Sequence, residues 1–204
     1  SQIFSDSIFS LSIAVVLLAP GGFISGILTH FKEGNIPLSV TLTSITSLVS
    51  PLTTVLWLSL ISVNLDDFNF NILQTFIQLA LLIFAPYILG FYLNRKEVKI
   101  VKKTSPLLDK FLKVYILTIT ITGPYELREP LINYFNESII LVFSSIFSIY
   151  VLQNITSKLT NISKADDRTV LIEALCQNFP IVLTLSIILN IPEMAIFGIV
   201  YYLI

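Results

Sequence analysis

Six apolar runs of membrane-spanning length, and a seventh still apolar at Ile204, most strongly limit how this chain can fold. A helix needs about 20 mostly apolar residues to cross the hydrocarbon core of a bilayer. A buried soluble core accounts for one or two such runs, but not for six. The composition agrees, because charged residues make up only 12% of the chain and apolar residues 54%, with a mean hydropathy of +0.85. Soluble domains carry about twice that share of charge.

The runs therefore predict an all-α fold, a polytopic transmembrane helical bundle that forms a single membrane domain. The expected spans are residues 8–31, 36–63, 71–93, 107–122, 138–159, 170–189 and 191–204, the last of them partial. Because the chain opens on Ser1 and its last span has no end, we expect it to be truncated at both ends. Ser163 to Asp166 has the pattern of a helix start ahead of the sixth span.

The charges are divided unequally between the loops. If the spans alternate, all but one of the 12 Lys and Arg residues fall on one side of the membrane, and only Arg128 falls on the other. The positive-inside rule places the basic side in the cytoplasm, and we expect a bacterial inner membrane. The basic run from Arg95 to Lys103 is then a loop that sets topology, so it calls for no nucleic-acid partner.

The first span carries a strong helix breaker near its middle, Pro20-Gly21-Gly22. Non-helical backbone at membrane depth is tolerated only where protein or a water-filled cavity satisfies its polar groups. A break here leaves a second half-helix, from about Phe23 to Phe31, whose N-terminus points free N–H groups and partial positive charge into the bundle. A simple kink is the alternative, since Pro and Gly are common in membrane helices.

The sixth span has a similar interruption, in the sequence EALCQNFPIV. It places Glu173 inside an apolar run and follows it with Gln177-Asn178 and Pro180. An ionisable residue at that depth is costly and usually functional, although a glutamate at the membrane surface near Arg168 is the plainer alternative. Two interrupted helices, one early and one late, are typical of inverted-repeat transporters whose broken helices cross near the midplane. Crossing breaks would bring Gly22 and Gln177 within about one helix diameter, ~10 Å.

Two stretches resemble the signatures of the bile acid:sodium symporter family. The first is PGGFISGILTHFKEGNIPLSVTLTSITSLVSP, from Pro20 to Pro51, and the second is EALCQN, from Glu173 to Asn178. The resemblance implies a chain covering the fourth to tenth helices of a ten-helix fold. It also implies sodium-coupled symport of an organic anion, bile-acid-like or a small carboxylate, by alternating access. The implied partners are the lipid bilayer, the anion and the coupling sodium ions, with no other cofactor.

The resemblance also implies site residues. One sodium position would use Ser25, Ser39, Thr43 and Glu173; a second would use Glu173, Gln177 and the backbone carbonyls of Ala174 and Cys176. The substrate would lie at the break, near Gly22, Phe23, Ile24 and Asn178. Oxygen ligands suit a hard cation, and Ser39 and Thr43 share a helix face one turn apart. The family's Ser-Asn pair is Ser25-Gly26 here, which removes one side-chain oxygen from the first position.

Other readings stay open. In a proton-coupled transporter, Glu173 would carry a proton; in an uncoupled transporter, it would carry no ion. A non-transporting remnant of the family would bind its ligand without transporting it. An intramembrane enzyme is disfavoured, because the chain has no HExxH motif, no Gly-x-Gly-Asp within a span and only one histidine, His30. Trp57 and the Tyr201-Tyr202 pair fit interfacial belts or bundle packing.

Overall fold

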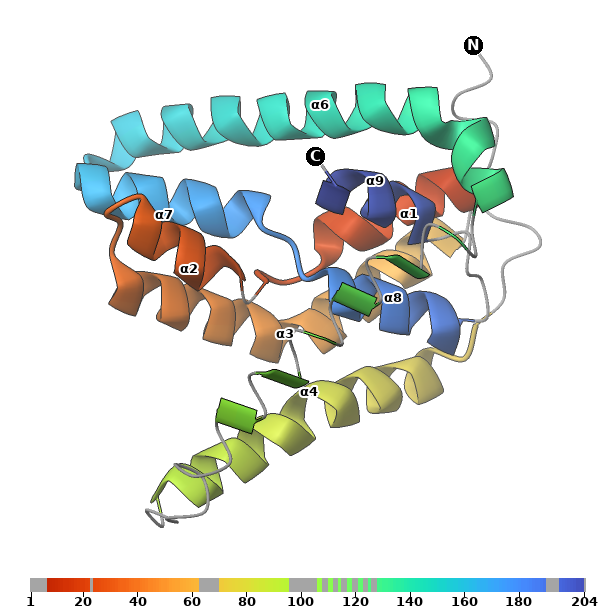
Figure 1. Cartoon of the computed structure of the whole chain (residues 1–204), viewed down its shortest axis with the longest axis horizontal. Coiled ribbons are helices and arrows are strands. Elements are labelled where there is room, and N and C mark those ends of the chain that lie inside the picture. The colour runs from red at the N-terminus through yellow and green to blue at the C-terminus, as the bar shows by residue number, and fades with distance from the viewer. Residues whose placement is uncertain are drawn as a thin grey trace.

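The computed structural model describes residues 7–22, 24–62, 70–95, 128–189 and 195–203, with 106, 107, 110, 111, 114, 117, 118, 121, 122 and 125. These residues form helices, and no strand occurs among them, so the predicted all-helical membrane bundle is confirmed (Figure 1). Much of the expected fourth span, 107–122, lies outside the described residues. So do Phe23 and the basic run from Lys96 to Lys103.

Two helices are broken, as the sequence predicts. The first consists of α1 (Ser7–Leu18) and α2 (Ile24–Phe31), and the second of α7 (Lys164–Leu175) and α8 (Phe179–Ile188). The helix start predicted from Ser163 to Asp166 is confirmed, because Ser163 is the N-cap of α7 and its hydroxyl accepts a hydrogen bond from Asp166 N. This cap satisfies one of the amide groups that the first turn of a helix leaves free.

Three long helices surround the broken pair: α3 (Ile36–Ser62), α4 (Ile72–Arg95) and α6 (Arg128–Thr160). Within the described part of the chain, three segments are long and apolar enough to cross a membrane, Ile36–Ile61, Ile72–Leu93 and Leu131–Thr160. Helix α6 begins ten residues before the expected span 138–159, because its first turns carry polar residues that a hydropathy window does not include.

Helix α3 continues through Pro51, although proline cannot donate the backbone hydrogen bond to Ser47 O. The Ser50 hydroxyl donates to that same carbonyl at 3.0 Å, so the freed acceptor is satisfied within the helix. Hydroxyl side chains are one of the ways in which membrane helices tolerate an internal proline. Pro51 therefore leaves α3 as one continuous support beside the two broken helices.

The core of the described part lies where α1, α8 and α9 (Ile196–Leu203) meet. Leu11 and Val15 of α1, Val182 of α8 and Phe197 of α9 are almost fully buried there. Helix α6 packs across α9 and α7, and α4 packs mainly on α3 and leaves most of its surface exposed (Figure 1). A membrane helix with so little buried surface is expected to face lipid or further protein.

The turn between α2 and α3 is attached to the start of α7. Asn35 N donates to the Thr169 hydroxyl at 2.7 Å, and the Asn35 side-chain amide donates to Asp166 Oδ1, also at 2.7 Å. The two broken helices are thereby joined a second time, away from their breaks. The α2–α3 turn, with Lys32, and the α6–α7 turn, which is flanked by Lys158 of α6 and Lys164 of α7, consequently lie at the same end of the bundle (Figure 1).

Candidate functional site

The backbones of the two broken helices meet at their breaks. Gly22 N donates to Cys176 O at 2.6 Å, Asn178 N donates to Pro20 O at 2.9 Å, and Gly21 pairs with Gln177 as an antiparallel bridge. Each break thus provides hydrogen-bond partners for backbone groups that the other break has freed. This avoids the cost of unpaired N–H and C=O groups inside a membrane. The predicted proximity of Gly22 and Gln177 is confirmed.

The glycines at the first break allow this close approach. A Cβ atom on Gly22 would lie 2.8 Å from Gln177 O, a backbone atom that cannot move aside, and one on Gly21 would lie 2.5 Å from Glu173 Oε2. Neither glycine has a positive φ, so the missing side chain, and not an unusual backbone conformation, is what the crossing requires.

Glu173 lies at the centre of a cluster of hydroxyl groups. Its side chain is 8% exposed, and it accepts hydrogen bonds from Ser39 at Oε1 and from Thr43 at Oε2, the latter 2.7 Å long. Because the Ser39 and Thr43 hydroxyls donate their protons to the carboxylate, the lone pairs on their oxygens are available to coordinate a cation. The cluster therefore offers a cation one negative charge and several oxygen ligands.

Ser25 extends this cluster from α2. It is buried, its hydroxyl donates to Gly22 O at 2.7 Å, and its Oγ lies 3.4 Å from the Thr43 hydroxyl. Beside it, a Cβ atom on Gly26 would meet only Ser39 Oγ, at 3.8 Å, so there is room for a larger side chain at this position. The structure thus brings Ser25, Ser39, Thr43 and Glu173 together and leaves space at Gly26 next to them.

The second break exposes backbone carbonyls beside Glu173. Ala174 O accepts from the Gln177 side-chain amide at 2.9 Å, and Cys176 O accepts from Gly22 N. Each carbonyl keeps a second lone pair. The break covers Cys176 to Asn178, and Pro180 lies just after it, in the first turn of α8, where the missing N–H costs nothing. Asn178 is the N-cap of α8 and accepts from Ile181 N at 3.3 Å.

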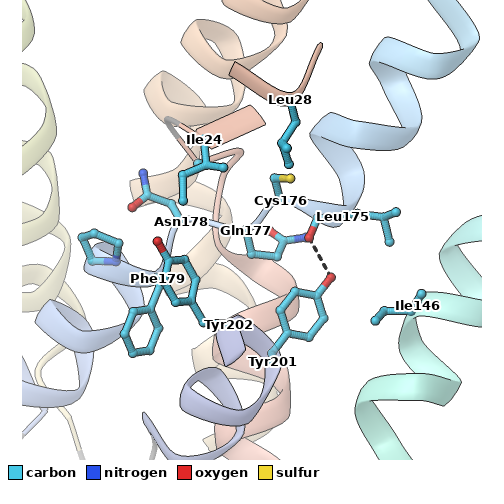
Figure 2. Close-up of a pocket in the computed structure, with 12 residues that line it drawn as sticks. Ile24, Leu28, Ile146, Leu175, Cys176, Gln177, Asn178, Phe179, Tyr201 and Tyr202 are labelled. Atoms are coloured by element: carbon cyan, nitrogen blue, oxygen red, sulfur yellow. Dashed lines mark hydrogen bonds between the residues drawn. The ribbon is translucent and has the colours of Figure 1, made fainter. Parts of the chain in front are cut away.

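A cavity of about 410 Å³ opens beside the crossing (Figure 2). Its lining is mostly apolar and comes from both breaks, from α2, α6 and α9, and from the adjoining ends of α7 and α8: Gly22, Ile24, Leu28, Ile146, Leu175, Cys176, Gln177, Asn178, Phe179, Pro180, Tyr201 and Tyr202. Of the residues expected near the substrate, Gly22, Ile24 and Asn178 line it, and Phe23 lies outside the described residues. No Lys, Arg or His occurs among these lining residues.

A second cavity, of about 390 Å³, lies against α3 and reaches Glu173 and Gln177. Thr46, Ser50 and Thr53 supply its hydroxyl groups. Among the described residues, no group of three or more His, Cys, Asp or Glu side chains gathers to hold a metal ion. Glu173 with hydroxyl and carbonyl oxygens is therefore the cation-binding chemistry that this crossing provides.

Residues 4–132 match the sodium bile acid symporter family, and this stretch is well over half of the 204-residue chain. The chain belongs to the sodium bile acid symporter family. A search among proteins with curated descriptions finds no match. Because symporters are transport proteins of membranes, the chain is an integral membrane transport protein and not an enzyme. The predicted membership of the family is confirmed.

The family match covers Pro20 to Pro51 and ends before Glu173. The second signature, from Glu173 to Asn178, is linked to the first by the contacts between the breaks. Two residues at the crossing were not predicted from sequence. The Thr46 hydroxyl accepts from Gly21 N at 3.4 Å, and the Tyr201 hydroxyl donates to Leu175 O at 2.9 Å. No sequence signal marked them, because a Thr one turn after Thr43 and a Tyr near the end of an apolar run are common in membrane helices.

Proposed function

We propose that this protein is a sodium-coupled symporter that carries an organic anion across the membrane. The observation behind the proposal is the crossing itself, where a buried carboxylate, hydroxyl groups and exposed carbonyls of two broken helices converge. Such convergence of discontinuous helices is how many secondary transporters build ion and substrate sites. Membership of a family of sodium bile acid symporters supports the same assignment.

Two sodium positions would share Glu173. The first would use the hydroxyls of Ser25, Ser39 and Thr43, which lie around the carboxylate. The second would use Gln177 with the carbonyls of Ala174 and Cys176. One carboxylate shared between two monovalent cations leaves a net positive charge. This charge attracts an anion, and the single carboxylate holds the sodium ions loosely enough for release on the other side of the membrane.

The anion would occupy the 410 Å³ cavity. Its charged group would face the break, where the N-terminus of α2 at Ile24 carries partial positive charge and Asn178 supplies a polar side chain. Its apolar part would face Ile146 and Phe179. Since the described lining has no cationic side chain, the helix terminus and the co-bound sodium ions would balance the negative charge. This arrangement favours a monoanion with a sizeable apolar body.

Alternating access would follow from movement of the crossing unit against the remaining helices. The two broken helices, which we expect to be related as inverted repeats, would expose the shared site to each side of the membrane in turn. We place the protein in the bacterial inner membrane, with the end of the bundle that carries Lys32, Lys158 and Lys164 facing the cytoplasm.

Uptake into proteoliposomes tests the proposal. The purified protein is offered a panel of labelled organic acids, from small carboxylates to bile acids, with an inward gradient of sodium, potassium or protons. The proposal predicts uptake of at least one apolar monoanion that needs the sodium gradient and is abolished when potassium replaces sodium. Uptake driven by a proton gradient and indifferent to sodium would instead assign proton carriage to Glu173.

A further inference from the structure

Two neighbouring residues of α9 contact the two sides of the second break. The Tyr201 hydroxyl donates to Leu175 O, the last residue of α7, at 2.9 Å (Figure 2). The Tyr202 ring stacks on Phe179, the first residue of α8, with ring centroids 5.0 Å apart and an angle of 18° between the planes. Helix α9 thus bridges the unwound segment from Cys176 to Asn178.

The carbonyl that accepts the hydrogen bond from Tyr201 lies between the two carbonyls that we propose as sodium ligands. Leu175 O lies between Ala174 O and Cys176 O, and it also accepts from Gln177 N at 3.2 Å. The last carbonyls of a helix lack partners within the helix, so their direction depends on external donors. Tyr201 is such a donor for Leu175, and it thereby limits the rotation of the peptide groups on either side.

The Tyr201 side chain is itself held in place. Its ring packs at an angle of 44° against Phe197, one turn earlier in α9, with 6.0 Å between ring centroids. Phe197 is fully buried in the core formed with α1 and α8. The Tyr201 ring, which also lines the cavity, therefore presents its hydroxyl to Leu175 from a helix that is packed into the core.

We propose that Tyr201 is a positioning residue for sodium: its hydroxyl holds the second break so that the Ala174 and Cys176 carbonyls face the ion position beside Glu173. The role rests on the proposed function, because it acts through those two carbonyls. It gives α9, which supplies no ion ligand among its described residues, a direct influence on sodium affinity. The Tyr202 ring packs on Phe179 of α8, and its hydroxyl does not take part in orienting the carbonyls.

Tyr201→Phe tests the role, because it removes one hydroxyl and keeps the packed ring. The matched control is Tyr202→Phe, which removes a hydroxyl from the next residue of the same cavity wall. The described structure gives that hydroxyl no hydrogen-bond partner. Loss of one hydrogen bond that orients ion ligands is expected to weaken sodium binding about three- to ten-fold.

Cys176 provides the readout. It is the only cysteine of this sequence, it lines the cavity, and it lies within the break. The rate at which N-ethylmaleimide labels the purified full-length protein is measured against sodium concentration, with potassium keeping the ionic strength constant and Cys176→Ser as the blank. We expect sodium to slow labelling in the wild type and in Tyr202→Phe at the same midpoint. In Tyr201→Phe the midpoint should shift three- to ten-fold higher.

The thermal unfolding midpoint in sodium-free buffer shows whether a variant has merely lost stability. Equal sodium midpoints in Tyr201→Phe and the wild type, with sodium protection intact, would overturn the positioning role alone. A labelling rate that does not respond to sodium in the wild type would overturn the sodium sites of the proposed function, and the positioning role with them. A higher midpoint confined to Tyr201→Phe supports both.

Discussion

Gly22 lies in the first break and Gly26 four residues later in α2, and the space around them differs. A Cβ atom at Gly22 meets backbone oxygens of the second break at 2.8 and 3.2 Å, whereas one at Gly26 meets only a hydroxyl at 3.8 Å. Gly22→Ala should therefore force the breaks apart, at a cost of about 1–3 kcal/mol, typical of overpacking. Gly26→Ala should be tolerated.

The two alanine variants are compared by thermal unfolding and by sodium-driven uptake. Gly22→Ala is expected to lose most transport and to unfold at a lower temperature, while Gly26→Ala keeps near-normal values in both measurements. If Gly22→Ala transported as well as Gly26→Ala, the close contact between Gly22 and Gln177 would not be a feature of the working protein.

Gly26→Asn should improve sodium binding. The structure leaves room for the side chain beside Ser39, and an amide oxygen there would add a ligand to the Glu173 cluster. One neutral polar contact is worth on the order of 1–3 kcal/mol, or about one to two decades in affinity. We expect the sodium concentration for half-maximal uptake to fall, with Gly26→Ala as the control for side-chain volume. An unchanged sodium dependence would mean that this position does not face an ion.

Residues of the site differ in how far the sequence predicts them. The four-residue spacing of Ser39 and Thr43 places both on one face of a helix, and the apolar surroundings of Glu173 predict a functional carboxylate. Their contact joins residues 130 and 134 positions apart, so no local pattern could reveal it. Only the family resemblance connected them. Tyr201 could not be found in this way, since its role depends on how α9 packs.

Among the elements, prolines show why one break was predictable. Pro51 and Pro86 lie inside continuous helices, whereas Pro20 begins a break. The difference is the Gly-Gly pair after Pro20, which lets a second backbone come close enough to satisfy the freed groups. The second break contains no proline or glycine. Polar Gln177 and Asn178 mark it, and the actual break, Cys176 to Asn178, comes before Pro180.

The link between the α2–α3 turn and α7 predicts a dependence of stability on acid. Hydrogen bonds from Asn35 and Ser163 hold the pKa of Asp166, at the start of α7 and outside the membrane-spanning part, below its ordinary value of 3.8. A lowered carboxyl pKa stabilises the fold at pH values above 3.8, and this contribution is lost as the pH falls through the folded-state pKa.

Asp166→Asn should therefore lower the unfolding temperature at neutral pH, and its difference from the wild type should shrink below about pH 4. Thermal unfolding of the purified protein between pH 7 and pH 3 measures this. Asn35→Ala removes the main donor, so Asp166→Asn should have a smaller effect in that background. A difference that stayed constant across the whole range would contradict the role of the ionised Asp166.

For the molecule as a whole, the apolar runs predicted the helical membrane class, and the paired interruptions predicted the crossing. Hydropathy could not predict the polar extension of α6 to Arg128 or the second joint at Asn35, because these depend on tertiary contacts. Both proposed sodium positions depend on one side chain. Glu173 belongs to both proposed sodium positions and lies at the contact between the two broken helices.

Binding of radiolabelled sodium to the purified protein, wild type against Glu173→Gln, therefore tests the account most directly. The substitution keeps the shape and removes a buried charge, so folding should survive, as an unchanged thermal unfolding curve in sodium-free buffer would show. We predict saturable sodium binding by the wild type that potassium does not displace, and at least a ten-fold loss of affinity in Glu173→Gln. Wild-type sodium affinity in a well-folded Glu173→Gln protein would contradict the account.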